Sequence, residues 1–184
     1  KFFISFIRED GLYIADNQTG QWQIESVWIY PNLTSAPLAM DSTGSLHLCS
    51  TPYYDMDGVI YATNQDGSWQ LETIDPESKT EGCTITVDDN DYVHLAYFNH
   101  DESSARYCND LTGNWVCEEV YSKADYCPRL LVDSDGYAHL FHRHSYINNI
   151  SGSWVTSDFL PYTTYDAAIG SDGMIHGVAN EVGL

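Results

Sequence analysis

The segment Asp133–His144 gathers the residue types that metal centres and acid/base catalysts use. Two carboxylates, Asp133 and Asp135, precede a glycine, and three histidines follow within six residues, with Arg143 among them. Imidazole and carboxylate groups bind divalent metals, and imidazole exchanges protons near neutral pH. Taken alone, the segment admits either a metal site or the acid/base machinery of a hydrolase.

The same segment is one copy of an internal repeat, and self-similarity at a fixed period is the mark of solenoid and propeller folds. A tryptophan after Gly-x occurs four times, with spacings of 47, 46 and 39 residues. A tyrosine and a polar turn precede each tryptophan, and a turn of the form Asp-x-x-Gly or a near variant follows and leads to a histidine. The repeated residues are Tyr13, Trp22 and His47; Tyr61, Trp69 and His94; Tyr107, Trp115 and His139; and Tyr146, Trp154 and His176.

Each unit divides into four short strands. An apolar strand such as Cys83–Val87 comes first, the turn follows, and a second strand such as Tyr92–Tyr97 carries the histidine. The third strand ends at the tyrosine element, and the tryptophan opens the fourth, as in Trp69–Ile74. Short strands with frequent turn signals and no helical period indicate an all-β protein. A four-stranded antiparallel unit of this size predicts one blade of a β-propeller.

The sequence therefore predicts a single β-propeller domain over residues 1–184, with about four blades' worth of sequence. The repeat units run over 1–36 (partial), 37–82, 83–127, 128–165 and 166–184 (partial). Phe2–Phe6 and Met174–Ala179 are strands of the same kind at the two ends, so we expect a part of a larger propeller. A swapped terminal strand, or assembly between chains through unpaired strand edges, is the alternative.

The pattern Tyr-x-x-Asn, Gly-x-Trp, Asp-x-x-Gly-x-x-His resembles the repeats of secreted and cell-surface β-propellers. These are distant relatives of the Asp-box propellers, which include sialidases and several lectins. The resemblance covers nearly the whole chain, but the sialidase Asp-box itself is not matched, because Thr63–Trp69 is shorter between Asp and Trp. The resemblance implies the fold and leaves the function open, since such propellers serve binding, adhesion and catalysis.

The net charge of the chain restricts the classes of partner that it can bind. Twenty-seven acidic and seven basic residues give a net charge of −20, which argues against nucleic acid and anionic membranes. No apolar run has the length of a membrane span. We therefore expect a glycan or protein ligand, with neither nucleic acid binding nor membrane insertion.

Cysteines and sequons favour a secreted or cell-surface protein. Cys108 and Cys117 flank a turn at a spacing that suits a cross-strand disulfide. Cys49, Cys83 and Cys127 have no pairing that the sequence decides. Three Asn-x-Ser/Thr sequons, at Asn17, Asn32 and Asn149, are predicted glycosylation sites.

Most repeated residues have a structural interpretation beside the functional one. The four histidines sit at a fixed offset in apolar strands, which is typical of packed side chains, although a ring of ligands is the alternative. The tryptophans fit seals between blades, and sugar stacking is their alternative. Asp133 and Asp135 resemble half a calcium loop, which makes Ca²⁺ the one candidate cofactor, but turn chemistry explains them equally.

Residues outside the repeat are the candidate binding site, and none is assigned a catalytic role. They fall between the second and third strands and between units, in segments rich in Tyr, His and carboxylate that suit carbohydrate or protein contact. A non-catalytic binding, adhesion or surface-assembly module is the first hypothesis, and a sialidase-like glycoside hydrolase is the alternative. The candidates are Tyr30, Tyr53, Tyr54, Asp55, Asp57, His100, Glu102, Tyr126, His142, Arg143 and His144.

Overall fold

A computed structural model describes residues 2–53, 58–158 and 163–180, and all regular structure within these ranges is β-strand. The strands form five antiparallel sheets. Sheet 1 contains β1 (Phe3–Arg8), β2 (Gly11–Asp16) and β3 (Gln23–Trp28). Sheet 2 contains β4 (Leu38–Met40), β5 (Leu46–Ser50), β6 (Val59–Thr63) and β7 (Gln70–Ile74), and sheet 3 contains β8 (Thr80–Val87), β9 (Val93–Asn99), β10 (Ser104–Asn109) and β11 (Val116–Tyr121). Sheet 4 contains β12 (Arg129–Val132), β13 (Ala138–His142), β14 (Ser145–Asn148) and β15 (Val155–Asp158), and sheet 5 contains β16 (Thr163–Ile169) and β17 (Ile175–Asn180).

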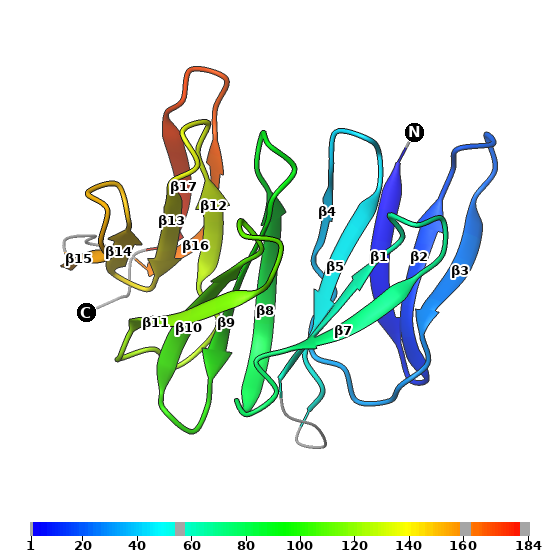
Figure 1. Cartoon of the computed structure of the whole chain (residues 1–184), viewed down its shortest axis with the longest axis horizontal. Helices are drawn as coiled ribbons and strands as arrows, with labels where there is room; N and C mark the ends of the chain where they lie inside the picture. The colour runs from blue at the N-terminus through cyan, green and yellow to red at the C-terminus, as the bar shows by residue number, and fades with distance from the viewer. Residues whose placement is uncertain (1, 54–57, 159–162, 181–184) are drawn as a thin grey trace.

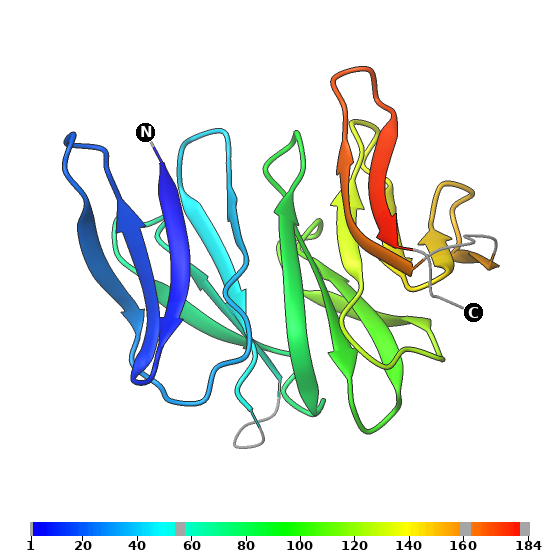
Figure 2. The same ribbon diagram turned by 180° about the vertical axis from the view of Figure 1, so that it is seen from behind.

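The predicted all-β architecture of four-stranded antiparallel sheets is confirmed. Strands follow chain order within each sheet, so every connection inside a sheet is a hairpin. The sheets also follow chain order in space, with sheets 1 and 5 at opposite ends of the molecule (Figure 1; Figure 2 from behind). The described strands therefore do not close a ring. Among them there is no helix that could span a membrane.

The place of a strand in its sheet determines its burial. Every residue of β5, β9 and β13, the second strands of sheets 2 to 4, is buried. These strands are covered on both faces by neighbouring sheets, so their sequences are mostly apolar, and the polar residues that they carry, such as His47, His94 and His139, are buried as well. The fourth strands β7, β11 and β15 are mostly exposed at the outer edge and carry charged or polar side chains, which discourage pairing with other chains. First strands make the contacts between sheets, β4 with β8, β8 with β12 and β12 with β16.

The recurrent histidine connects the turn to the third strand. At Asp41, one carboxylate oxygen accepts from the backbone N–H groups of Thr43 and Ser45 at 2.9 and 2.8 Å. The other oxygen lies 3.3 Å from His47 Nε2, and His47 Nδ1 lies 2.6 Å from Tyr61 Oη. Because a carboxylate only accepts, Nε2 carries the proton and Nδ1 accepts from the tyrosine hydroxyl.

Two further copies of this network, at His94 and His139, confirm the structural interpretation for three of the repeated histidines, whereas the fourth, His176, is exposed. In sheet 4, His139 lies 3.0 Å from Asp133 and 2.6 Å from Tyr146. In sheet 3, His94 lies 2.5 Å from Tyr107 Oη and 3.5 Å from Asp88 Oδ2. Burial lowers the pKa of His94 more than the Asp88 charge raises it, so this ring is neutral at pH 7.

The tyrosines of this network also receive the tryptophan of the next sheet. Tyr61 meets Trp115 edge-on with ring centroids 5.0 Å apart, and Tyr107 meets Trp154 at 5.1 Å. Edge-to-face contact is a favourable aromatic geometry. The tryptophans therefore seal neighbouring sheets, whereas Trp22 on the outer face of sheet 1 is 54% exposed.

Sheet 1 departs from the expected repeat alignment. Ser5 pairs with Ile14, as Cys49 pairs with Tyr61, so Ile14 and not Tyr13 occupies the repeated tyrosine position. By the same register Phe3 stands where His47 stands, and an apolar pair replaces the hydrogen-bonded one. Tyr13 instead donates to Asp10 at 2.9 Å.

A side-chain cap recurs after each third strand and accounts for two of the sequons. Asn149 Oδ1 accepts from Ala138 N at 2.8 Å, as Asn64 Oδ1 accepts from Leu46 N at 2.7 Å. Asn17 Oδ1 does the same for Phe2 N at 2.8 Å. The side chains of Asn17 and Asn149 are therefore hydrogen-bonded to the backbone. Asn32, in the third sequon, is exposed on the β3–β4 connection.

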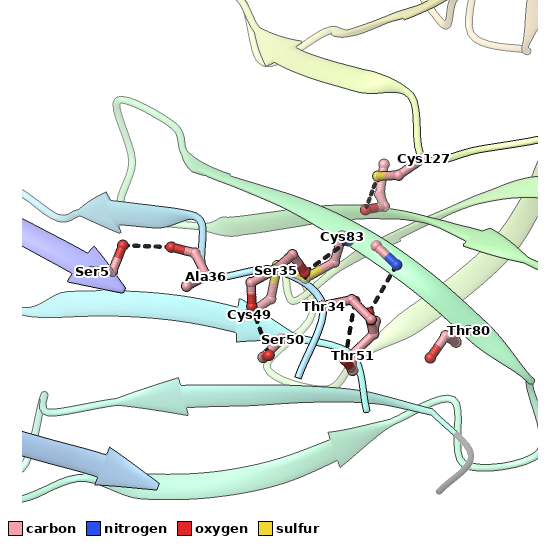
Figure 3. Close-up of a disulfide and its surroundings, with 12 residues drawn as sticks. Ser5, Thr34, Ser35, Ala36, Cys49, Ser50, Thr51, Thr80, Cys83 and Cys127 are labelled. Carbon is pink, nitrogen blue, oxygen red and sulfur yellow. Dashed lines mark hydrogen bonds between the residues drawn. A yellow bond between two sulfur atoms is a disulfide. The ribbon is translucent and has the colours of Figure 1, made fainter. Parts of the chain in front are cut away.

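Two disulfides lie in the core between sheets 2 and 3. Cys108 and Cys117 are joined across β10 and β11, as the spacing suggested, and Cys49 and Cys83 join β5 to β8 of the next sheet. Figure 3 shows the second bond beside Ser50, whose hydroxyl donates to Ser35 O at 2.6 Å. Cys127 is a free thiol, and burial raises its pKa to about 12.

The inter-sheet disulfide should contribute more stability than the hairpin disulfide. It closes a 34-residue separation against 9 residues, and the chain-entropy model gives the longer loop about 1 kcal/mol more. We expect the variant Cys49→Ala/Cys83→Ala to have a lower free energy of unfolding in urea than Cys108→Ala/Cys117→Ala. Both pairs line the same core, so each is the control for the other, and the reverse order would contradict the prediction.

Asp41 should make part of the stability dependent on pH. Burial alone would raise its pKa, but hydrogen bonds from Thr43, Ser45 and His47 outweigh burial and lower the pKa to about 2. A lowered pKa stabilises the fold fully above the unfolded value of about 3.9, and this stability is lost as the pH falls through about 2. We expect Asp41→Asn to lower the free energy of unfolding by about 2 kcal/mol at pH 7 and to weaken its pH dependence between about pH 4 and 2.

Urea unfolding at several pH values measures this effect. The exposed Asp89 is the matched control, and Asp89→Asn should leave the pH profile unchanged. Parallel profiles for Asp41→Asn and the unmodified protein would contradict the prediction.

Candidate functional site

The candidate binding residues lie at the end of the sheets opposite to the Asp turns. Connections from second to third strands, and from each sheet to the next, all fall at this end because the strands run up and down in order (Figure 1). Tyr54, Asp55 and Asp57 lie outside the described residues. The other candidates form separate local groups, one in each of sheets 2, 3 and 4.

Each group joins a hairpin to the connection that leads into the same sheet. Tyr53 N donates to Asn32 O at 2.6 Å in sheet 2, and His100 N donates to Lys79 O at 2.8 Å in sheet 3. In sheet 4, Arg143 N donates to Tyr126 Oη at 3.0 Å. Hairpin and connection are thereby fixed to each other.

The sheet 4 group is built around Asp125, which sequence analysis missed. Arg143 binds both carboxylate oxygens, through Nε at 2.9 Å to one and through Nη2 to the other. The buried His142 lies with Nε2 3.0 Å from Asp125 Oδ1. The rings of Tyr126 and His142 are tilted to each other with centroids 4.5 Å apart, and the Arg143 guanidinium lies 5.3 Å from the Tyr126 ring centre.

The charged and titratable side chains of this group shift one another's pKa values. The Arg143 hydrogen bonds are the main reason that the pKa of Asp125 is lowered. Burial lowers the pKa of His142, although the Asp125 charge acts in the opposite direction. Arg143 also adopts a φ of 50°, a left-handed conformation that costs energy for a residue with a side chain. The Asp125 carboxylate and the hydroxyl and ring of Tyr126 hold Arg143 in this conformation. Asp125, Tyr126, His142 and Arg143 therefore form a clamp that fixes the β13–β14 hairpin to the connection before β12.

A second clamp occupies the same place in sheet 3. Asp75, on the connection after β7, forms an ion pair with Arg106, whose Nε lies 3.0 Å from Oδ2, and it accepts hydrogen bonds from Ser78 Oγ at 2.7 Å and from Tyr97 Oη. Glu102, a predicted binding residue, lies 3.2 Å from Arg106 Nη1. Its remaining contacts are with Asn99 and Ser104. Glu102 is therefore part of an internal network.

This comparison corrects one expectation. His142 has counterparts, because the residue three positions after the recurrent histidine is Ser50 in sheet 2, Tyr97 in sheet 3 and His142 in sheet 4. All three are buried and hydrogen-bond to the preceding connection or lie against its carboxylate. The strand β13 ends at His142, so His142 and His144 do not continue one strand face.

The remaining candidates are more accessible. Tyr53 is 45% exposed, and His100 and His144 are also exposed. Tyr30 stacks on Trp28 with ring centroids 4.6 Å apart. These side chains belong to different sheets and present polar and aromatic groups at the surface.

Of the two predicted calcium ligands, the Asp133 carboxylate is engaged within its own turn. Asp133 Oδ1 accepts from Asp135 N and Tyr137 N at 3.0 and 2.9 Å, and its other oxygen faces His139. Within the described ranges, no group of three His, Cys, Asp or Glu side chains is arranged to hold a metal ion. Turn chemistry is a sufficient explanation of Asp133.

The four arginines are dispersed over the molecule. Arg106 pairs with Asp75, Arg143 with Asp125, and Arg129 with Asp166 at 2.9 Å. Arg8 lies over the Tyr13 ring at 5.2 Å. Arg8 lies on sheet 1, Arg106 on sheet 3, and Arg129 and Arg143 at two different places on sheet 4, each with its own partner, so the guanidinium groups do not gather around a common anion site.

A double-mutant cycle on Asp125→Asn and Arg143→Gln should detect the clamp in solution. Both side chains are about half exposed, so we expect a coupling of about 1 kcal/mol or less in the free energy of unfolding. Because exposed charges are screened, the coupling should shrink in 1 M salt. A coupling of zero at low salt would show that the clamp does not form.

Comparison with known proteins gives a fold and no family. No family model matches the chain, and no curated protein matches it. A solved structure, the extracellular domain of a protein assigned as a one component system in B. thetaiotaomicron, is similar with a TM-score of 0.62 at 11% identity. The match covers 96% of this chain and 24% of that one, so the chain spans about a quarter of the length of this structural neighbour.

Proposed function

We propose that the chain is part of an extracellular β-propeller that binds a glycan or protein partner and catalyses no reaction. The propeller is supported by sheets of one repeated design, arranged in chain order and touching through their first strands. The two disulfides favour an oxidising compartment, and the structural neighbour is an extracellular domain.

The observation that carries the non-catalytic assignment is the dispersal of the arginines. A sialidase-like enzyme needs several guanidinium groups around one substrate carboxylate. Here three of the four arginines each pair with a different carboxylate, and Arg8 lies over a tyrosine ring on another sheet. The Asp125 carboxylate is likewise bound to Arg143, which lowers its pKa and makes it unsuited to donate a proton.

The charge and the exposed faces support a binding role. Arg106, Arg129 and Arg143 are neutralised within the molecule, so the net charge of −20 leaves an acidic surface that favours basic or neutral partners. The outer face of sheet 1 also exposes apolar side chains, Phe2, Ile4, Trp22 and Ile24, which is the surface on which a further sheet of this repeat could pack.

Incubation with a panel of arylglycosides, including a sialoside, tests the assignment directly. We expect no release of the aryl group above that of a buffer control, together with retention on a glycan array or by a basic protein ligand. Turnover that is lost in Arg143→Gln and retained in Asp89→Asn would overturn the non-catalytic assignment.

A further inference from the structure

A cavity of about 460 Å³ lies between sheets 3 and 4, at the end that carries the Asp turns. Glu118 on β11 forms one wall, and Ser153 and Trp154, directly before β15, form another. Tyr137, in the β12–β13 turn, completes it, and Asn149 and two glycines fill the lining. None of the clamp residues takes part, so this site is separate from the candidates at the opposite end.

The lining combines aromatic rings with one carboxylate. Trp154 is held in place by its edge-to-face contact with Tyr107 at 5.1 Å, and Tyr137 is 37% exposed. The Glu118 carboxylate is exposed and makes no hydrogen bond or ion pair within the part of the chain that the structure describes. No lysine or arginine lines the cavity.

An equivalent cavity between sheets 2 and 3 serves as an internal comparison. Glu72 and Trp115 occupy the places of Glu118 and Trp154, since Tyr61 pairs with Glu72 as Tyr107 pairs with Glu118. That cavity is smaller, at about 250 Å³, and Trp115 Nε1 donates to Glu72 at 3.2 Å. The glutamate of β7 therefore has a structural partner in the tryptophan of the next sheet, whereas the equivalent glutamate of β11 faces an open cavity.

We propose that the cavity of Glu118, Tyr137 and Trp154 binds the cationic side chain of a lysine or arginine in a basic partner protein. The inference rests on the proposed binding function and gives it a class of partner. An ammonium or guanidinium group is attracted to aromatic faces and forms charge-assisted hydrogen bonds with a carboxylate. Both partners are present here, and the net charge of −20 attracts cations to the whole surface.

A neutral sugar fits the same lining less well. Asn149 Oδ1 is already engaged by the backbone N–H of Ala138 at 2.8 Å, which removes one acceptor from the wall. The remaining charged group, Glu118, gains most from a ligand that carries the opposite charge. The lining thus favours a cation over a hydroxyl-rich ligand.

Titration with a single-lysine peptide, acetyl-Gly-Gly-Lys-Gly-Gly-amide, followed by NMR at the Trp154 indole N–H, tests the proposal. The matched probe has Gln in place of Lys. We expect the lysine peptide to shift the Trp154 resonance and the glutamine peptide to leave it in place, and the shift should weaken as salt is raised. Glu118→Gln should weaken lysine-peptide binding about tenfold, because a hydrogen bond to a charged group is lost.

Glu119→Gln is the matched control, since it removes the same charge from the same strand on the opposite face. It should leave the affinity unchanged, and both variants should melt as the unmodified protein does. Equal shifts with the two peptides, equal loss in both variants, or a shift with N-acetylglucosamine and none with the lysine peptide would each overturn the proposal. Turnover of an arylglycoside would instead overturn the non-catalytic assignment and leave this cavity untouched.

Discussion

A buried chain of hydrogen bonds from a turn carboxylate through an imidazole to a tyrosine hydroxyl is the interaction on which the rest of the structure depends. In sheets 2 to 4 the histidine is almost fully buried, and burying a polar ring costs energy unless its nitrogens have partners. Both nitrogens of His47 and His139 are hydrogen-bonded, and in sheet 3 His94 Nδ1 is bonded to Tyr107 while Nε2 lies 3.5 Å from Asp88. Supplying those partners fixes the turn between the first and second strands and the position of the third strand. The tyrosine then presents its ring to the tryptophan of the next sheet. One network therefore sets the geometry inside sheets 2, 3 and 4 and the contacts between them.

The repeated part of this design could be read from the sequence because it depends on short spacings. The distances from Asp41 to His47 and from the glycine to Trp69 are fixed by one turn and one hairpin, so they recur. The repeat alignment was wrong in sheet 1 because Phe3 and Ile14 stand in place of the histidine and tyrosine of the other units. An apolar pair cannot be distinguished in the sequence from other apolar strand residues. The partner of Cys83 also could not be chosen, since its approach to Cys49 depends on how two sheets pack.

The candidate site illustrates the same division. Tyrosines, histidines and charges gather in the connecting segments, and the sequence placed them at one end of the molecule. The sequence did not reveal their partners. Asp75 and Asp125 are separated from Arg106 and Arg143 in the sequence, and neither aspartate belongs to a recognisable motif. Once the partners are known, much of this apparent binding chemistry proves to be loop architecture. The Glu118 carboxylate was overlooked because it belongs to none of the motifs read from the sequence and lies outside the connecting segments.

The covalent link between Cys49 and Cys83 has a consequence for how the molecule comes apart. Each sheet contacts mainly its neighbours along the row, so stability passes from sheet to sheet by nearest-neighbour coupling, as in repeat proteins. The disulfide joins sheets 2 and 3, and both disulfides lie in the core that these sheets share. Sheets 2 and 3 thus form the most cooperative unit, from which local opening becomes progressively easier toward the outer sheets.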